Sequence, residues 1–227
     1  MPYPLANPPQ RSAAKMLDRR AVLHGWLALA GCWGARLAGQ PSPVRVTREE
    51  PVVRRTQFDP ERPPPDMPTL TPPEAGVCNT TFELAASVSY SAEPLSPTTA
   101  RVYVDELDLT TRLAFDIYTA RGAPAKLRAH EEAHRQIAEH YYRNAPTIAA
   151  EIGRRLIGQT FDGAGIDPDA AQRDGFEKVI AAIEQAYMAR VRTPSAAANV
   201  RFDEITNHGL NDIAEAEAIA LATGADP

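Results

Sequence analysis

The chain has 227 residues, enough for one domain of ordinary size with additional segments. Its formal net charge is −5 at pH 7 and no basic patch interleaved with aromatic residues occurs, which argues against nucleic acid as a partner. The two cysteines, Cys32 and Cys78, are too few for a disulfide framework.

Residues 1–31 have the pattern of an export signal. Arg19 and Arg20 precede an apolar run over residues 21–33, which is too short for a membrane span and fits a signal peptide. The arginine pair also resembles a twin-arginine signal, so two export routes remain open. Because residues 1–15 are rich in proline and unlike the start of a signal peptide, Met16 is a candidate for the true start.

The apolar run ends in Leu-Ala-Gly-Cys, which resembles the bacterial lipobox. Cleavage before Cys32 leaves a lipid-modified N-terminal cysteine, and ordinary cleavage near residues 38–39 is the alternative. We therefore expect an exported protein of the periplasm or cell envelope, anchored to the membrane through Cys32. From residue 41 to 73 nearly every third residue is proline, so residues 32–75 are predicted to form an extended, poorly packed tether.

The folded domain is predicted to span residues 76–227. Residues 81–90 and 100–118 are rich in β-branched and aromatic residues and partly alternate, as half-buried strands do. One strand is expected to bury Val102, Val104 and Leu107, and a returning strand Leu113, Phe115 and Ile117, with a turn near residues 108–111. The pattern predicts an α+β domain in which a small antiparallel sheet precedes several helices.

Helical periodicity predicts helices over residues 124–143, 147–156, 169–191, 196–208 and 211–221. Residues 159–169 carry several Asp, Gly and Pro residues and are predicted to form a loop. Thr193 and Pro194 are predicted to interrupt the helical pattern, and Gly209 suits the cap after a helix.

The run His130-Glu131-Glu132-Ala133-His134 is an H-E-x-x-H sequence within the first of these helices. At about 100° per residue, His130, Glu131 and His134 share the apolar face of the helix. A buried carboxylate is costly unless it is paired or bound to something. The spacing therefore predicts a zinc ion held by both histidines, with Glu131 activating a water bound to that zinc. In the competing interpretation both histidines are core residues hydrogen-bonded to the sheet.

Two histidines do not complete a zinc site, and three kinds of third ligand are open. His140 has the spacing found in metzincins, but Ile137 stands where those enzymes have glycine, so the helix continues and turns His140 about 120° away from His134. A distant glutamate is the second kind, from among Glu177, Glu184, Glu204, Glu215 and Glu217. His208 is the third, at the end of a helix, where the partial negative charge favours a cation.

Residues 202–209 read Phe-Asp-Glu-Ile-Thr-Asn-His-Gly. Together with H-E-x-x-H, this run resembles a family of bacterial predicted secreted zinc-dependent proteases, a domain of unknown function with a downstream aromatic-Asp-x-x-Thr-x-His-Gly. The resemblance covers roughly residues 82–227, and its matching positions are His130, Glu131, His134, Phe202, Asp203, Thr206, His208 and Gly209. Phe202 replaces the more usual tyrosine, so this chain lacks the hydroxyl at that position.

These features predict a zinc metallopeptidase of the cell envelope with a zincin-like active-site helix, acting on a protein or peptide. The expected zinc ligands are His130, His134 and His208, with Glu131 as general base and Asp203 orienting a ligand. One alternative is a lipoprotein that keeps the scaffold only for binding, and another is a zinc-dependent peptidoglycan hydrolase. Tyr141, Tyr142 and Tyr187 are all candidates for stabilising the transition state.

Overall fold

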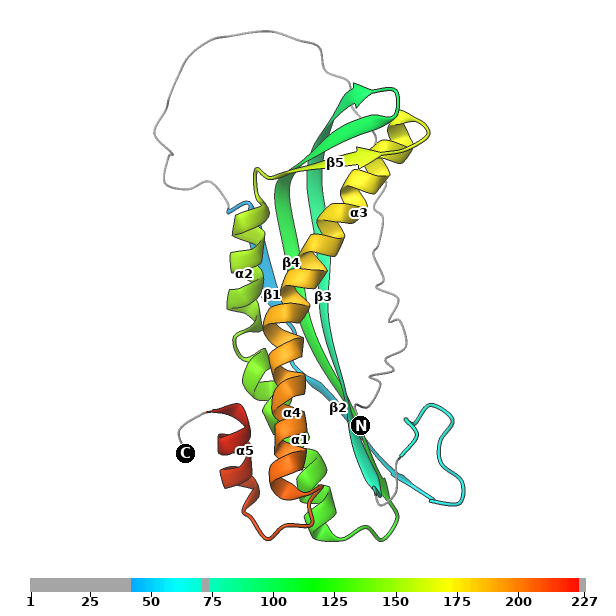
Figure 1. The fold of residues 1–227 in the computed structure, drawn as a ribbon, viewed down its shortest axis with the longest axis vertical. Coiled ribbons are helices and arrows are strands. Elements are labelled where there is room, and N and C mark those ends of the chain that lie inside the picture. Colours follow the sequence, from blue (N-terminus) through cyan, green and yellow to red (C-terminus); the bar gives the residue numbers. More distant parts are fainter. Residues whose placement is uncertain (1–41, 71–73, 225–227) are drawn as a thin grey trace.

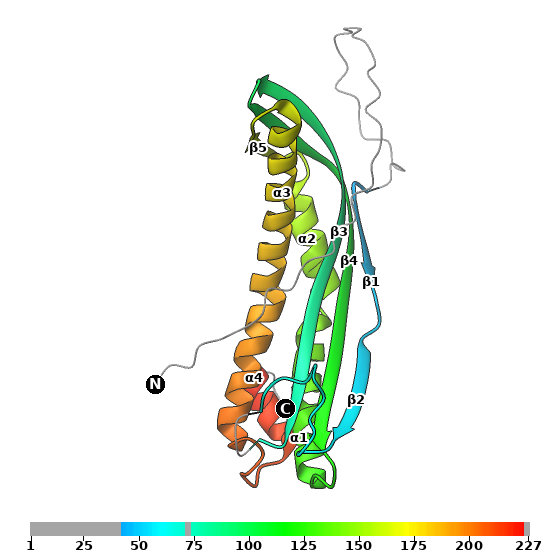
Figure 2. The same ribbon diagram turned by 90° about the vertical axis from the view of Figure 1, so that its right-hand side faces the viewer.

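The computed structural model describes residues 42–70 and 74–224. The predicted signal peptide, the alternative start at Met16 and the anchor at Cys32 lie outside these residues. The described part is a mixed α/β structure in which a long sheet is covered on one face by helices (Figure 1, Figure 2). None of the helices within it is long and apolar enough to cross a membrane.

Two long strands form the centre of the sheet. β3 (Gly76–Ser96) and β4 (Thr99–Ala120) pair antiparallel along almost their whole length. The opposite edge of β4 pairs in turn with β5 (Thr160–Ala164), which is antiparallel, and with β1 (Val44–Arg48) and β2 (Val52–Phe58), which are both parallel. The sheet is therefore mixed and five-stranded, and the prediction of a small antiparallel sheet is wrong.

β4 runs straight through residues 108–111, where the sequence predicts a turn. Its buried positions change from even to odd numbers between Val104 and Leu107, because a β-bulge leaves Asp105 without a partner residue on β3. The bulge keeps the buried side chains before and after it on the same face of the sheet, although their numbering changes from even to odd. All six residues expected on the inner face are indeed buried: Val102, Val104, Leu107, Leu113, Phe115 and Ile117.

β1 and β2 fall within residues 32–75, which the proline content predicts to be a tether. That prediction is wrong for residues 44–58, because Val44 and Phe58 are buried and both strands pair with β4. Each strand is a short run free of proline, and prolines flank the runs at Pro43, Pro51 and Pro60. Proline removes a ladder hydrogen bond, so it limits the strands without preventing them. The folded part begins more than 30 residues before the expected boundary at residue 76.

The helices are α1 (Ala125–Tyr142), α2 (Ala145–Leu156), α3 (Pro168–Tyr187), a π-helical turn (Met188–Arg192), α4 (Thr193–Thr206) and α5 (Glu215–Thr223). α3, the π-helical turn and α4 form one continuous column in Figure 1. The predicted interruption at Thr193 and Pro194 is therefore wrong. Pro194 lies in the first turn of α4, where a missing N–H is tolerated, and the wider π turn precedes it. The predicted loop over residues 159–169 contains β5.

The interior has a large core beneath the sheet, a smaller one where α1, α4 and α5 meet, and a third around Phe58, Tyr118 and Ala120. The smaller core is built mostly of small side chains around one ring: Ala133, Ile137, Ala198, Phe202, Ala218 and Ala222. Small residues let helices approach closely. This packing brings the H-E-x-x-H helix against α4, and so determines which side chains meet the two histidines.

Candidate metal centre

The candidate site lies where α1 and α4 meet the beginning of β3. α1 carries His130, Glu131 and His134 on its inner face, as the periodicity predicts, and His130 and Glu131 are each only 4% exposed. α4 contributes Asn199 and Asp203, which are four residues apart and therefore on the same side of that helix. Side chains from two separate helices thus face one another across their contact.

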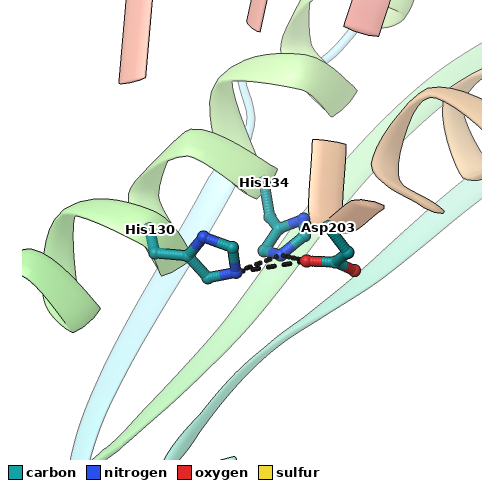
Figure 3. Close-up of side chains that lie close together, drawn as sticks. All are labelled: His130, His134 and Asp203. Atoms are coloured by element: carbon teal, nitrogen blue, oxygen red, sulfur yellow. Dashed lines mark hydrogen bonds and ion pairs between the residues drawn. The ribbon is translucent and has the colours of Figure 1, made fainter. Parts of the chain in front are cut away.

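Three potential metal-ligand atoms converge at this contact (Figure 3). The Nε2 atoms of His130 and His134 lie 3.2 Å apart, and Oδ1 of Asp203 lies 3.1 Å from each of them. Tetrahedral zinc with bonds of about 2.0–2.1 Å holds neighbouring ligand atoms roughly 3.3–3.4 Å apart. The nearly equilateral triangle and its donor set, two imidazoles and a carboxylate, therefore fit a zinc ion with three protein ligands.

The electrostatics of the triangle favour a positive charge at its centre. Burial by itself would raise the pKa of Asp203, but the facing imidazoles of His130 and His134 outweigh it and hold that pKa below its ordinary value. Burial would lower the pKa of His134, and the Asp203 carboxylate reverses this, so the net direction is upward. The Oδ1 atom of Asp203 is buried, yet it has no well-oriented hydrogen bond among the described residues. A cation would satisfy that oxygen.

The two histidine rings are held in place by different contacts. Oδ1 of Asn199 lies 2.7 Å from Nδ1 of His134, and the Asn199 amide is itself fixed because its Nδ2 donates to the Ser195 carbonyl oxygen at 2.9 Å. His134 therefore carries its proton on Nδ1 and presents the Nε2 lone pair to the triangle. The ring of His130 stacks on Phe202, with centroids 4.9 Å apart, and within the described residues its buried Nδ1 has no hydrogen-bond partner.

Glu131 lies beside the triangle as a buried carboxylate. Burial raises the pKa of Glu131 to about 7, although the charge of His134 and a hydrogen bond from the Cys78 backbone N–H act in the opposite direction. Gly76 gives the carboxylate its room, because a Cβ at that position would lie 2.8 Å from Glu131 Oε1. A carboxylate with a pKa near neutrality is suited to both accepting and returning a proton at pH 7.

Asp203 occupies the position that the sequence analysis gives to His208. His208 lies nearby, but its Nδ1 is 3.8 Å from Asp203 Oδ1 and its side chain is 53% exposed, so it stands outside the triangle. His140 faces away and pairs with Arg143 through its Nδ1. None of the five candidate glutamates belongs to the group that the described residues form.

Asn199 was not predicted as part of the site, and Asp203 was expected only to orient a ligand. The one available signal was the spacing of Asn199 and Asp203 by four residues on a predicted helix. The tyrosines do not reach the site: Tyr142 donates its hydroxyl proton to backbone oxygens near β1 and β4, and Tyr187 is fully buried in the main core. Tyr141 packs against the small core of α1, α4 and α5.

A cavity of about 670 Å³ opens over the triangle. Its walls are the beginning of β3, the inner face of α1, α4 and the turn that follows α4. Its polar lining includes the three residues of the triangle together with Glu131, Asn199 and His208. The cavity is large enough to admit part of a substrate beside the buried carboxylate.

Comparisons with known proteins add no family to this geometry. No protein-family model, no curated protein and no solved structure matches the chain.

Proposed function

We propose that the chain is a zinc-dependent metallopeptidase of the bacterial cell envelope. The observation that carries this proposal is the convergence of His130, His134 and Asp203 beside the buried carboxylate of Glu131. The H-E-x-x-H spacing and the resemblance of residues 202–209 to predicted secreted zinc proteases support it. The proposed location in the cell envelope rests on the predicted export signal and the predicted lipid anchor at Cys32.

The ligand set of this proposal is His130, His134 and Asp203. Structural zinc sites commonly use four protein ligands, whereas catalytic sites use three and leave one position for water or substrate. Zinc held by these three side chains would supply a Lewis acid that polarises a carbonyl group and lowers the pKa of water. The cavity above the triangle gives a substrate access to the ligand atoms.

Glu131 acts as the general base. As a water oxygen bonds to the carbonyl carbon of an amide, the Glu131 carboxylate accepts the proton that the water loses. When the C–N bond breaks, Glu131 returns that proton to the amine nitrogen, and the carboxylate is regenerated. The pKa of about 7 and the N–H of Cys78 keep the group poised and oriented for both transfers.

The proposal is tested with the full chain and two glutamine variants of adjacent residues. Glu131→Gln should retain one zinc per chain and lose hydrolysis of unfolded protein or peptide by about 10²–10⁴-fold, because it removes only the base. Glu132→Gln is the matched control, since the Glu132 carboxylate pairs with Arg55 and Arg135 and is not among the residues that line the cavity. It should keep both zinc and activity.

The choice of substrates separates the alternatives. Glu131-dependent cleavage of peptides supports the metallopeptidase, whereas Glu131-dependent cleavage of muropeptides alone would identify a peptidoglycan hydrolase. Bound zinc without any Glu131-dependent hydrolysis would overturn the enzymatic proposal and favour a binding role. A chain that binds no zinc would overturn the metal site itself.

A further inference from the structure

The turn after α4 holds an unusual backbone conformation at the mouth of the cavity. Asn207, His208 and Gly209 are consecutive residues with positive φ, at 49°, 53° and 78°. Glycine adopts this region readily, but residues with a Cβ do so at a steric cost. Such strained residues persist only where their surroundings hold them, and they concentrate at functional sites.

Hydrogen bonds from both helices hold this turn. The backbone N–H of His208 donates to the Asp203 carbonyl oxygen at 3.1 Å, and that of Asn211 donates to the Thr206 carbonyl oxygen at 2.8 Å. From the start of α1, Nζ of Lys126 donates to the Asn211 carbonyl oxygen at 2.7 Å. The turn is therefore fixed to α4 and to α1, the two helices that supply the triangle.

Gly209 fits the turn directly against the site. A Cβ at Gly209 would lie 3.3 Å from Cγ of His130, which is tighter than an ordinary contact, and its φ of 78° already disfavours any other residue. Because Gly209 packs against His130, the backbone of the preceding residue, His208, is held close to the triangle. It lines the cavity and reaches Asp203 Oδ1 only at 3.8 Å, beyond hydrogen-bonding distance.

Three other polar side chains of α1 and α4 that line the cavity already have partners outside the triangle. His134 uses Nδ1 for Asn199, Asn199 uses its amide for Ser195, and Lys126 is committed to the turn. Among the described residues, the polar contact of the His208 ring is the long one to Asp203. An exposed ring N–H thus remains for a group that enters the cavity.

Resting on the metallopeptidase function proposed above, we infer that His208 is a catalytic residue that donates a ring N–H to the substrate carbonyl oxygen. As the water oxygen bonds to the carbonyl carbon and its proton passes to Glu131, the π electron pair of the C=O bond moves onto that oxygen. The N–H of His208 stabilises the resulting oxyanion. When the pair re-forms the C=O bond, the C–N bond breaks and the nitrogen takes the proton from Glu131.

The strained turn gives this donor its efficiency. Donors that are already in place where charge develops cost no reorganisation during the reaction. The hydrogen bonds of Asp203, Thr206 and Lys126 hold the turn that carries His208 in position. This role replaces the zinc-ligand role that the sequence pattern predicts for His208.

The test measures zinc content, kcat and KM of the full chain with three substitutions. His208→Ala should retain one zinc per chain, lower kcat by about 10²–10³-fold and change KM little. His208→Gln, which keeps an N–H donor, should recover part of the loss. His140→Ala is the control, because His140 pairs with Arg143 and is not among the residues that line the cavity, so this variant should behave as the unsubstituted chain.

Two results with His208→Ala alone would overturn this role, and comparison with Glu131→Gln shows whether the proposed function fails with it. Loss of zinc in His208→Ala would show that His208 is a ligand, and an unchanged kcat would show that it takes no part in catalysis. If peptide hydrolysis depends on Glu131 while His208→Ala remains fully active, only the His208 inference fails. If no hydrolysis depends on Glu131, the proposed function fails and this inference with it.

Discussion

Oδ1 of Asn199 lies 2.7 Å from Nδ1 of His134, so a side chain of α4 sets the orientation of a ring on α1. The amide cannot reverse without losing its second bond, from Nδ2 to the Ser195 carbonyl oxygen. The Nδ1 proton is thereby fixed, and the Nε2 lone pair points toward Asp203. Such outer contacts of a ligating histidine raise its basicity and restrict its rotation.

Asn199→Ala is expected to weaken zinc binding by about 10–100-fold, because His134 loses the partner that holds its tautomer and orientation. Asn199→Asp keeps an acceptor at the same place and should preserve most of the affinity. Competition with a chromogenic chelator measures both constants. Equal zinc affinity in Asn199→Ala and the unsubstituted chain would show that the Asn199 contact plays no part in the metal site.

Asp203→Asn should lower zinc affinity by more than about 100-fold, beyond the usual effect of an outer contact, since it removes a charged ligand. Glu204→Gln is the matched control: Glu204 is the next residue on α4, its side chain is exposed, and it was a candidate ligand on sequence alone. Zinc content after dialysis against buffered metal gives the comparison. The reverse result, with Glu204→Gln losing zinc and Asp203→Asn keeping it, would contradict the triangle.

Gly76→Ala tests the position of the base without touching a ligand. The added Cβ would lie 2.8 Å from Glu131 Oε1 and 3.1 Å from the Tyr118 carbonyl oxygen, so the Glu131 carboxylate must move. A displacement of about 1 Å can cost on the order of 10²-fold in rate, and we expect a loss of that size in kcat with zinc content unchanged. Asn79→Ala, at an exposed position on the same strand, should leave kcat unaltered.

The sequence predicts the H-E-x-x-H helix and its buried face well, because both depend on a local period of 3.6 residues. It does not predict the third member of the triangle. Asp203 reaches the histidines because α1 and α4 pack through Ala133, Ala198 and Phe202, and no spacing along the chain reports that contact. The motif that contains Asp203 was informative, but it led to His208 as the predicted ligand and to Asp203 only as a residue that orients a ligand.

The errors in the sheet have local physical causes. The predicted turn at residues 108–111 is absent because the buried positions keep alternating through Leu107, Leu109, Thr111 and Leu113, and the β-bulge lies before them, at Asp105. The proline content of residues 41–73 suggests a tether, and it hides two proline-free runs of five and seven residues that become β1 and β2. Composition averaged over a long window cannot report strands this short.

A chain that begins at residue 76 should be less stable than one that begins at residue 42. The shorter chain lacks β1 and β2, which cover one edge of β4 and bury Val44 and Phe58. Burial of two such side chains contributes about 3–6 kcal/mol, so we expect Tm to fall by more than about 6 °C. The exposed edge should also favour aggregation, visible in size-exclusion chromatography. Equal Tm values would mean that β1 and β2 add nothing to the stability of the fold.

The stability of the metal-free protein should depend on pH through Glu131. The folded-state pKa of Glu131 is about 7, above its ordinary value of 4.5, because the carboxylate is buried. Below pH 4.5 the group is protonated whether the chain is folded or unfolded, so it carries no penalty. As pH rises from 4.5 to 7, the unfolded chain loses the proton more readily than the folded chain, and stability falls by about 3 kcal/mol.

Glu131→Gln removes this titration and supplies the comparison. Chemical denaturation of both metal-free proteins between pH 4.5 and 8 gives the free energy of unfolding at each pH. The difference between the two proteins should grow in favour of the variant up to about pH 7 and then remain constant. Parallel curves over the whole range would show that Glu131 has an ordinary pKa in the folded chain, and would remove the physical basis for its action as a base near neutral pH.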